Sequence, residues 1–168
     1  LDGPLDYLFA SEEYGRRLAA ELGAQFIPTN GWRSLLKSSG TAIRERPWDH
    51  WEALPRPVRP YYVGRVSVFG PESTGKSTLA ADLARHYGTV SVPEFARTWL
   101  EQRGGEVRAE DMPVIARGQA ASEDALAYQA HRLLFCDTDP LLTTLWSQEL
   151  FGLEMTPAPR EYSLTLLL

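Results

Sequence analysis

The sequence predicts an α/β fold in which parallel strands alternate with helices that cover both faces of the sheet. Short apolar runs of strand length alternate along the chain with stretches of helical period. One such run, LLFCD at residues 133–137, is almost continuously apolar, which is typical of a parallel strand buried on both faces. A glycine-rich turn, GPESTGKST at residues 70–78, falls where a strand is expected to pass into a helix. Together these patterns indicate an open, doubly wound sheet.

The first part of the chain reads as the end of a Rossmann-like sheet. Strands are predicted at residues 7–10 and 25–27, with a helix between them that has Ser11 as its N-cap and Gly23 as its stop. A further helix is predicted from Pro47. This order of strand, helix and strand favours a parallel arrangement.

A proline-rich stretch, LPRPVRPYY, follows this first part. Prolines at 55, 57 and 60 disfavour a regular helix and favour an extended, semi-rigid connector. We therefore expect a domain at residues 1–54, a linker at 55–62 and a second domain at 63–168.

The second domain is predicted to contain four strands and four helices. The strands are expected at residues 65–69, 90–92, 133–137 and 162–168, and the helices at 76–87, 95–102, 113–131 and 142–150. In the first of these helices Leu79, Leu83 and Tyr87 are expected to face inward, and Asp111 is the predicted N-cap of the third.

Composition excludes several classes of function. The chain has 168 residues, a formal charge of -5 and a pI of about 5.2, which argues against a nucleic-acid binder or a membrane-surface protein. The single cysteine, Cys136, excludes an internal disulfide and a cysteine zinc site. No run reaches the length of a membrane span and no signal peptide opens the chain, so a cytoplasmic location is expected.

Four residues satisfy the phosphate-loop pattern: Gly70, Gly75, Lys76 and Ser77. The glycines allow the backbone amides to turn toward phosphate, and the following helix N-terminus adds partial positive charge. Lys76 supplies a full positive charge, and the Ser77 hydroxyl is a magnesium ligand. The alternative is a glycine-rich turn without a ligand, which leaves Lys76 unexplained. We therefore predict that this loop binds phosphate together with Mg²⁺.

A phosphate loop needs a second acidic group for magnesium at the end of a neighbouring buried strand. Asp137 ends the apolar run LLFCD and fits that place, and Asp139 follows two residues later. The alternative for either aspartate is that it caps the helix that follows.

The segment PEFAR follows the predicted strand 90–92, and the carboxyl end of this strand should face the same crevice as the phosphate loop. Glu94 could accept a proton from an attacking hydroxyl, and Arg97 could hold phosphate oxygens or the Glu94 carboxylate. The alternative is an ordinary surface ion pair. No Asp-x-x-Gly follows the loop and no Asn-Lys-x-Asp occurs, which makes a small-molecule kinase a better prediction than a GTPase.

The segments SGTAIR, PRPVRPYY, GPESTGKST, PEFAR and FCDTD occur in this order. The combination resembles the bifunctional bacterial enzymes of the NadR type, which join nicotinamide-mononucleotide adenylyltransferase to ribosylnicotinamide kinase. The resemblance implies phosphorylation of nicotinamide riboside with ATP and Mg²⁺, and adenylyl transfer from ATP to nicotinamide mononucleotide. VPEFARTW also looks like the strand end of deoxynucleoside kinases, where the glutamate is the general base, and this supports Glu94 by analogy.

The resemblance also implies a role for each matching residue. Asp137 would be the magnesium carboxylate, while Glu94, Arg97 and Asp139 would face the riboside. The ATP phosphate cradle would be formed by Gly70, Glu72, Ser73, Thr74, Gly75, Lys76, Ser77 and Thr78.

SGTAIR resembles the second signature of nucleotidyltransferases, in which a helix start and an arginine hold the ATP triphosphate. Four residues would then bind polyphosphate: Ser39, Gly40, Thr41 and Arg44. The alternative is an everyday N-cap. Nothing before Ser38 resembles the histidine-bearing phosphate motif of that family.

We therefore expect a fragment of a longer enzyme that stops before the lid of the kinase domain. The identity of the nucleoside, a non-catalytic ATP-binding regulatory role and the formation of a homo-oligomer stay open at this point.

Overall fold

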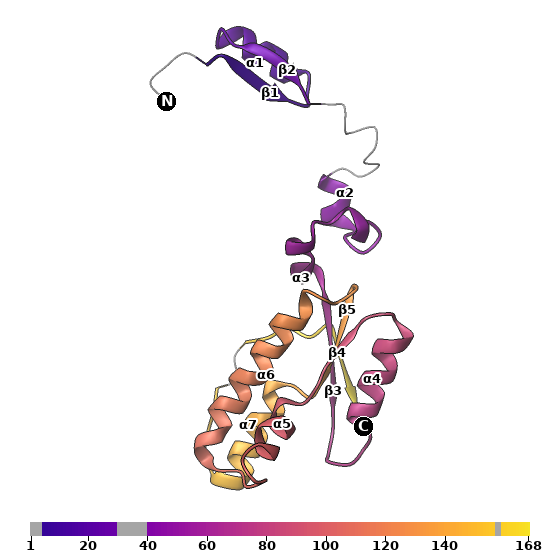
Figure 1. Ribbon diagram of the computed structural model, residues 1–168, viewed down its shortest axis with the longest axis vertical. Helices are drawn as coiled ribbons and strands as arrows, with labels where there is room; N and C mark the ends of the chain where they lie inside the picture. Colours follow the sequence, from indigo (N-terminus) through magenta and orange to yellow (C-terminus); the bar gives the residue numbers. More distant parts are fainter. Residues whose placement is uncertain (1–4, 30–39, 157–158) are drawn as a thin grey trace. The chain divides into compact units, whose positions relative to one another are not determined.

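The computed structural model describes residues 5–29, 40–156 and 159–168 (Figure 1). The chain divides into two compact units, Leu1–Ala53 and Leu54–Leu168, and each is described by itself. Within the described residues no helix is both long enough and apolar enough to cross a membrane.

The first unit contains a pair of parallel strands, β1 (Tyr7–Ala10) and β2 (Gln25–Pro28), joined through helix α1 (Tyr14–Glu21). Gly15 allows α1 to lie close to the strands, because a Cβ at this position would overlap the side chain of Ala10. The prediction of Ser11 as the N-cap of this helix is wrong, because α1 begins later and its N-cap is Glu13.

Within the described residues of the same unit, the helix α2 (Gly40–Glu45) and the 3-10 turn η2 (Trp51–Ala53) follow. The helix predicted from Pro47 is limited to this 3-10 turn. Pro55 favours the end of the turn after Ala53, because proline disfavours helical geometry at the residue before it. Trp51 is 1% exposed and anchors the turn.

The proline-rich connector is helical rather than extended, which corrects the prediction. It forms the 3-10 turn η3 (Arg56–Val58) and the short helix α3 (Arg59–Tyr62), both at the start of the second unit. Pro57 and Pro60 each occupy one of the first two helical positions. Proline fits there because these positions have no intrahelical partner for an N–H.

The second unit is an α/β fold with a four-stranded parallel sheet, as predicted. The strands are β3 (Gly64–Phe69), β4 (Val90–Val92), β5 (Leu133–Asp137) and β6 (Leu164–Leu167), in the spatial order β4-β5-β3-β6. All three pairings are parallel. The carboxyl ends of these strands therefore meet at one edge of the sheet.

Helices cover both faces of this sheet (Figure 1). Helix α4 (Lys76–His86) lies on one face, and α5 (Phe95–Glu101), α6 (Met112–Ala127) and α7 (Pro140–Phe151) lie on the other. A 3-10 turn, η4 (Ala109–Asp111), leads into α6. The predicted N-cap position of Asp111 is confirmed, although its carboxylate accepts hydrogen bonds from Trp99 and Arg108 rather than from α6.

The α4 face of the sheet holds the apolar core. Val66, Val68 and Phe135 pack there against Ala80 and Ala84. Small alanines allow the helix to approach the sheet closely. Leu79 and Leu83 pack at the edge of this core as predicted. Tyr87 is 52% exposed, and its ring lies against Phe135 with the centroids 5.7 Å apart, so it covers the rim of the core.

The opposite face holds a buried polar network centred on Glu123, which is 0% exposed. The Tyr162 hydroxyl donates to Glu123 Oε1 at 2.9 Å. Arg160 lies 3.5 Å from Glu123 Oε2 and donates two hydrogen bonds of 2.8 Å to Asp124. Burial is the largest effect on Glu123 and raises the pKa of its carboxyl. These contacts attach the segment before β6 to helix α6.

Cys136 is 0% exposed within β5, and burial is the main reason that the pKa of its thiol is raised. Because the thiolate is the reactive form, we expect negligible reaction with Ellman's reagent in the native protein and one equivalent in denaturant. The measurement is the absorbance change on mixing. Rapid stoichiometric labelling of the native protein would contradict this burial.

Candidate functional site

The turn between β3 and α4 has the backbone geometry of a phosphate cradle. Gly75 has φ +90 and is the N-cap of α4, and Ser73 has φ +62. These positive angles curl the backbone as a nest of amides requires. Gly70 is needed for another reason, since a Cβ there would lie 2.5 Å from the carbonyl oxygen of Leu168.

Lys76 is the first residue of α4 and is only 9% exposed. Its Nζ donates to the carbonyl oxygen of Pro71, and the Thr74 hydroxyl donates to the same oxygen at 2.9 Å. Because a carbonyl is a neutral partner, this contact does not neutralise the positive charge of Lys76, which can act on a phosphate oxygen. Ser77 is half-buried and Thr78 is exposed, and both lie with Lys76 in the first turn of α4.

Asp137 ends β5, opposite Val68 of β3 in register. It is 3% exposed, and its Oδ1 is buried without a hydrogen-bond partner among the described residues. A buried carboxylate oxygen needs a cation or a donor, so Asp137 has the available oxygen that a magnesium ligand requires. Ser77, in the first turn of α4, carries the hydroxyl predicted as a second ligand. No group of three acidic, histidine or cysteine side chains suited to a metal occurs in the described part of the chain. Magnesium at phosphate sites typically uses one or two carboxylates and the phosphates themselves.

Asp139 occupies a different environment, in which both of its carboxylate oxygens already have partners. Oδ1 accepts from the backbone N–H of Leu142 at 3.1 Å and caps helix α7. Oδ2 accepts from the Ser67 hydroxyl at 2.9 Å. This geometry favours the capping alternative over contact with a substrate.

Glu94 precedes α5 and lies at the same edge of the sheet as the phosphate loop. Its side chain is 25% exposed, and the guanidinium of Arg97 donates to its Oε2 at 3.3 Å. Burial is the largest influence and raises the pKa of Glu94, with a further rise from the charge of Asp137, whereas Arg97 and Lys76 act in the opposite direction. Residues from three separate strand ends therefore form one electrostatic group.

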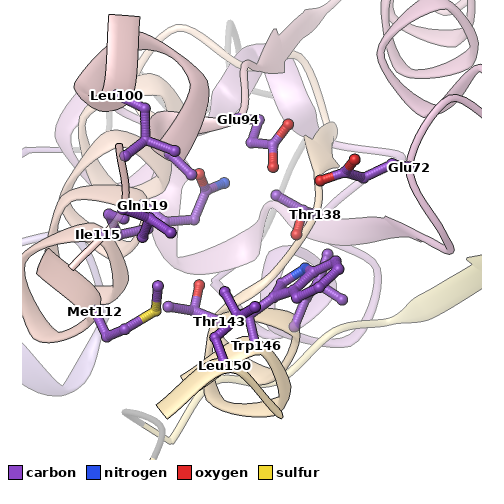
Figure 2. Close-up of a pocket in the computed structure, with 13 residues that line it drawn as sticks. Glu72, Glu94, Leu100, Met112, Ile115, Gln119, Thr138, Thr143, Trp146 and Leu150 are labelled. Atoms are coloured by element: carbon purple, nitrogen blue, oxygen red, sulfur yellow. The ribbon is translucent and has the colours of Figure 1, made fainter. Parts of the chain in front are cut away.

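Two neighbouring cavities share six lining residues, among them Glu94. One, of about 380 Å³, lies over the phosphate loop and includes Gly70, Ser73 and Lys76 in its lining. The other, of about 370 Å³, is mostly apolar and is shown in Figure 2. Its lining includes Glu72, Val107, Met112, Ile115, Gln119, Thr138, Leu142, Thr143, Trp146 and Leu150. The pair of cavities offers one chamber for phosphates and one for an apolar ring.

Sequence reasoning identified Glu72 and Glu94 but missed the other residues that line the apolar cavity. Met112, Ile115 and Gln119 share one face of α6 because they are three and four residues apart. Gln119 could have been found from the sequence, because it is a polar residue on the face of the predicted helix that is expected to point inward. Thr138 and Trp146 carried no comparable signal: Thr138 directly follows β5, and Trp146 reaches the cavity only because α7 packs against α6.

The SGTAIR segment of the first unit is described from Gly40 onward, and Ser39 lies outside the described residues. Gly40, Thr41 and Arg44 lie on the single helix α2, where all three are at least partly exposed. The Arg44 guanidinium donates to the Thr41 hydroxyl at 3.4 Å. The three residues thus form one small group of donors.

Residues 65–168 match the protein family described as AAA domain. The trifunctional NAD biosynthesis/regulator protein NadR of Escherichia coli strain K12 is 33% identical over 154 residues, which are 89% of this chain and 38% of the relative. NadR of Salmonella typhimurium strain LT2 is 33% identical over 153 residues, 88% of this chain and 37% of the relative. Homology to NadR is therefore confirmed, over a minor part of the length of those proteins.

Two solved structures are similar to this chain. A crystal structure of NadR protein in complex with NAD and AMP-PNP has a TM-score of 0.77 and 25% identity, covering 97% of this chain and 51% of that chain. A second, of NadR protein in complex with NR, has a TM-score of 0.72 and 26% identity, covering 90% of this chain and 45% of that chain. Both similarities agree with the α/β fold.

Proposed function

Because this chain belongs to the AAA domain family, we propose that it is the kinase part of an NAD biosynthesis enzyme, which transfers the γ-phosphate of ATP to nicotinamide riboside. One observation carries the proposal: Glu94 lines both the phosphate-loop cavity and the apolar cavity. A carboxylate at that junction is where a base is needed for a hydroxyl that attacks a phosphate.

The chemistry assigns a role to each group. The 5′-hydroxyl oxygen of the riboside attacks the γ-phosphorus, the bond from this phosphorus to the β,γ-bridging oxygen breaks, and ADP leaves. Glu94 accepts the proton of the hydroxyl. Lys76 and the backbone amides of residues 70–75 stabilise the negative charge on the phosphates. Ser77 and Asp137 would hold a magnesium ion, which would supply further positive charge to the phosphates.

The apolar cavity supports a nucleoside with a cationic aromatic ring. Trp146, Leu142 and Met112 provide apolar surface for a ring, while Glu72 and Glu94 bring carboxylates to the same cavity. Nicotinamide riboside carries a positive pyridinium ring, which carboxylates and an indole face both favour. The crystal structure of the related NadR protein with NR points to the same class of substrate.

One experiment on the full-length gene product distinguishes the proposed activity from two alternatives, a kinase for another nucleoside and a non-catalytic ATP-binding module. Transfer of labelled phosphate from ATP is compared for nicotinamide riboside, uridine and deoxyadenosine. We expect the highest kcat/KM with nicotinamide riboside. Preference for a neutral nucleoside would show a different kinase, and ATP binding without transfer to any of them would indicate a regulatory module.

Adenylyl transfer to nicotinamide mononucleotide stays a prediction that rests on the NadR resemblance. Gly40, Thr41 and Arg44 are the described residues that we propose for contact with the ATP triphosphate in that reaction. We also propose a cytoplasmic location, which agrees with the unpaired, buried Cys136.

Arg97→Met is expected to shift the acid limb of the kinase pH profile to higher pH. Glu94 must be ionised to act as a base, so activity falls as the pH falls through its pKa. Arg97 lowers the pKa of Glu94, and its removal raises this pKa. We expect kcat/KM to fall about two- to fivefold more at the acid end of the profile than at about pH 8. An acid limb that stays in place or moves to lower pH would contradict this coupling.

A further inference from the structure

Gln119 of helix α6 is held in one orientation by the backbone of α5. It is 2% exposed, and its Oε1 accepts a hydrogen bond from the backbone N–H of Phe95 at 2.9 Å. The reversed amide would set an N–H against an N–H, so this contact determines which end of the side chain is the acceptor. The other end of Gln119 is consequently a donor.

That donor, Nε2, is buried and has no hydrogen-bond partner among the described residues. Gln119 lines the apolar cavity, where its amide lies among Ile115, Thr138 and Glu94 (Figure 2). The Gln119 side chain also acts on Glu123, one turn further along α6, where it opposes the rise in carboxyl pKa that burial causes. An amide nitrogen carries two hydrogens, so at least one is left for another acceptor. Buried donors without partners are rare and indicate a missing ligand or solvent atom.

We propose that Gln119 is a specificity-determining residue whose Nε2 donates a hydrogen bond to the carbonyl oxygen of the carboxamide on the substrate ring. This inference rests on the proposed function, since it places the nicotinamide ring in the apolar cavity. A carbonyl supplies the acceptor that the oriented amide requires. A substrate with a carboxylate instead of the carboxamide would be repelled by the negative charges of Glu72 and Glu94, which line the same cavity. The site therefore selects the amide over the acid.

Gln119 also acts on the position of Glu94, and the test must separate the two effects. The hydrogen bond to Phe95 secures the first residue of α5, directly after Glu94. Gly118 supports the same contact, because a Cβ there would overlap the ring of Phe95. A change at Gln119 that moves α5 therefore lowers turnover of every substrate, whatever its ring carries.

The experiment compares nicotinamide riboside with pyridine riboside, which has the same positive ring and lacks the carboxamide. Gln119→Glu keeps an acceptor for Phe95 and loses the donor, whereas Gln119→Met loses both. We expect the wild type to favour nicotinamide riboside in kcat/KM by about 10- to 100-fold. In both variants this ratio should fall to about one, and Gln119→Met should in addition lower kcat for both substrates. Arg117→Ala, exposed on α6, is the matched control and should preserve the ratio.

Equal losses for both substrates, with the ratio of the wild type retained, would overturn the proposal and leave Gln119 as a positioning residue only. Calorimetry also measures the equilibrium affinities for nicotinamide riboside and pyridine riboside, and the ratio of these two affinities is compared between wild type and variants. If the wild type transfers phosphate to neither riboside, the proposed function fails, while the affinity ratio still tests Gln119. An affinity ratio that the variants leave unchanged overturns the proposal in that case too.

Discussion

Glu94→Gln is expected to lower kcat for transfer to nicotinamide riboside by about 10²- to 10⁴-fold, which is the usual contribution of a positioned general base. The amide has nearly the same shape and cannot accept the proton of the attacking hydroxyl. The Glu94 side chain lies at the junction of the two cavities, near Lys76 and Asp137. Binding of ATP should change little, because the backbone of residues 70–75 and Lys76 hold the phosphates.

The measurement is single-turnover transfer from labelled ATP, with nucleotide affinity determined separately by fluorescence titration. Glu149→Gln, an exposed glutamate of α7, is the matched control and should retain full activity. A Glu94→Gln enzyme within a few-fold of the wild type would remove Glu94 as the base. A large loss of ATP affinity would instead assign Glu94 a role in nucleotide binding.

Arg160→Met is expected to destabilise the second unit by about 3 kcal/mol, which is the usual cost of removing one partner from a buried ion pair. Arg160 donates to both carboxylate oxygens of Asp124 at 2.8 Å and to the carbonyl oxygen of Ala120 at 2.9 Å. It also lies 3.5 Å from Glu123, whose side chain is 0% exposed. Without Arg160, the carboxylate of Glu123 stays buried with less compensating charge.

Hydrogen exchange of the β3 and β5 amides measures this change within the second unit. Arg85→Met removes an exposed ion pair with Asp82 of 2.7 Å and should cost no more than about 1 kcal/mol. Adding Glu123→Gln to Arg160→Met should restore part of the lost stability. Equal effects of Arg160→Met and Arg85→Met would contradict a buried role for Arg160.

The pH dependence of the Arg160→Met effect follows from the same network. Arg160 lowers the pKa values of Glu123 and Asp124, so the wild type gains stability from Arg160 when these carboxyls are ionised. This stability is lost as the pH falls and the carboxyls are protonated. The difference between variant and wild type should therefore shrink toward acid pH. A constant difference would indicate that Arg160 acts by packing alone.

Local signals were sufficient for the sheet and for the phosphate loop. The strands at 90–92 and 133–137 occur where short apolar runs predicted them, and α4 begins at Lys76 directly after the glycine-rich turn. Strand patterns and glycine positions depend on neighbouring residues, which a sequence displays directly. The connector was mispredicted because proline disfavours the interior of a helix but fits its first turn.

By itself the sequence determined the alternation of strands and helices, the phosphate loop and the candidates Glu94 and Asp137 at strand ends. Only the tertiary structure decided that Asp139 caps a helix, that Glu94 joins two cavities and that Gln119 presents a donor. Those outcomes depend on contacts between residues distant along the chain, such as Phe95 with Gln119 and Tyr162 with Glu123. Such pairings arise when helices pack on the sheet, and a helical period shows which face is inward but not which residues meet there.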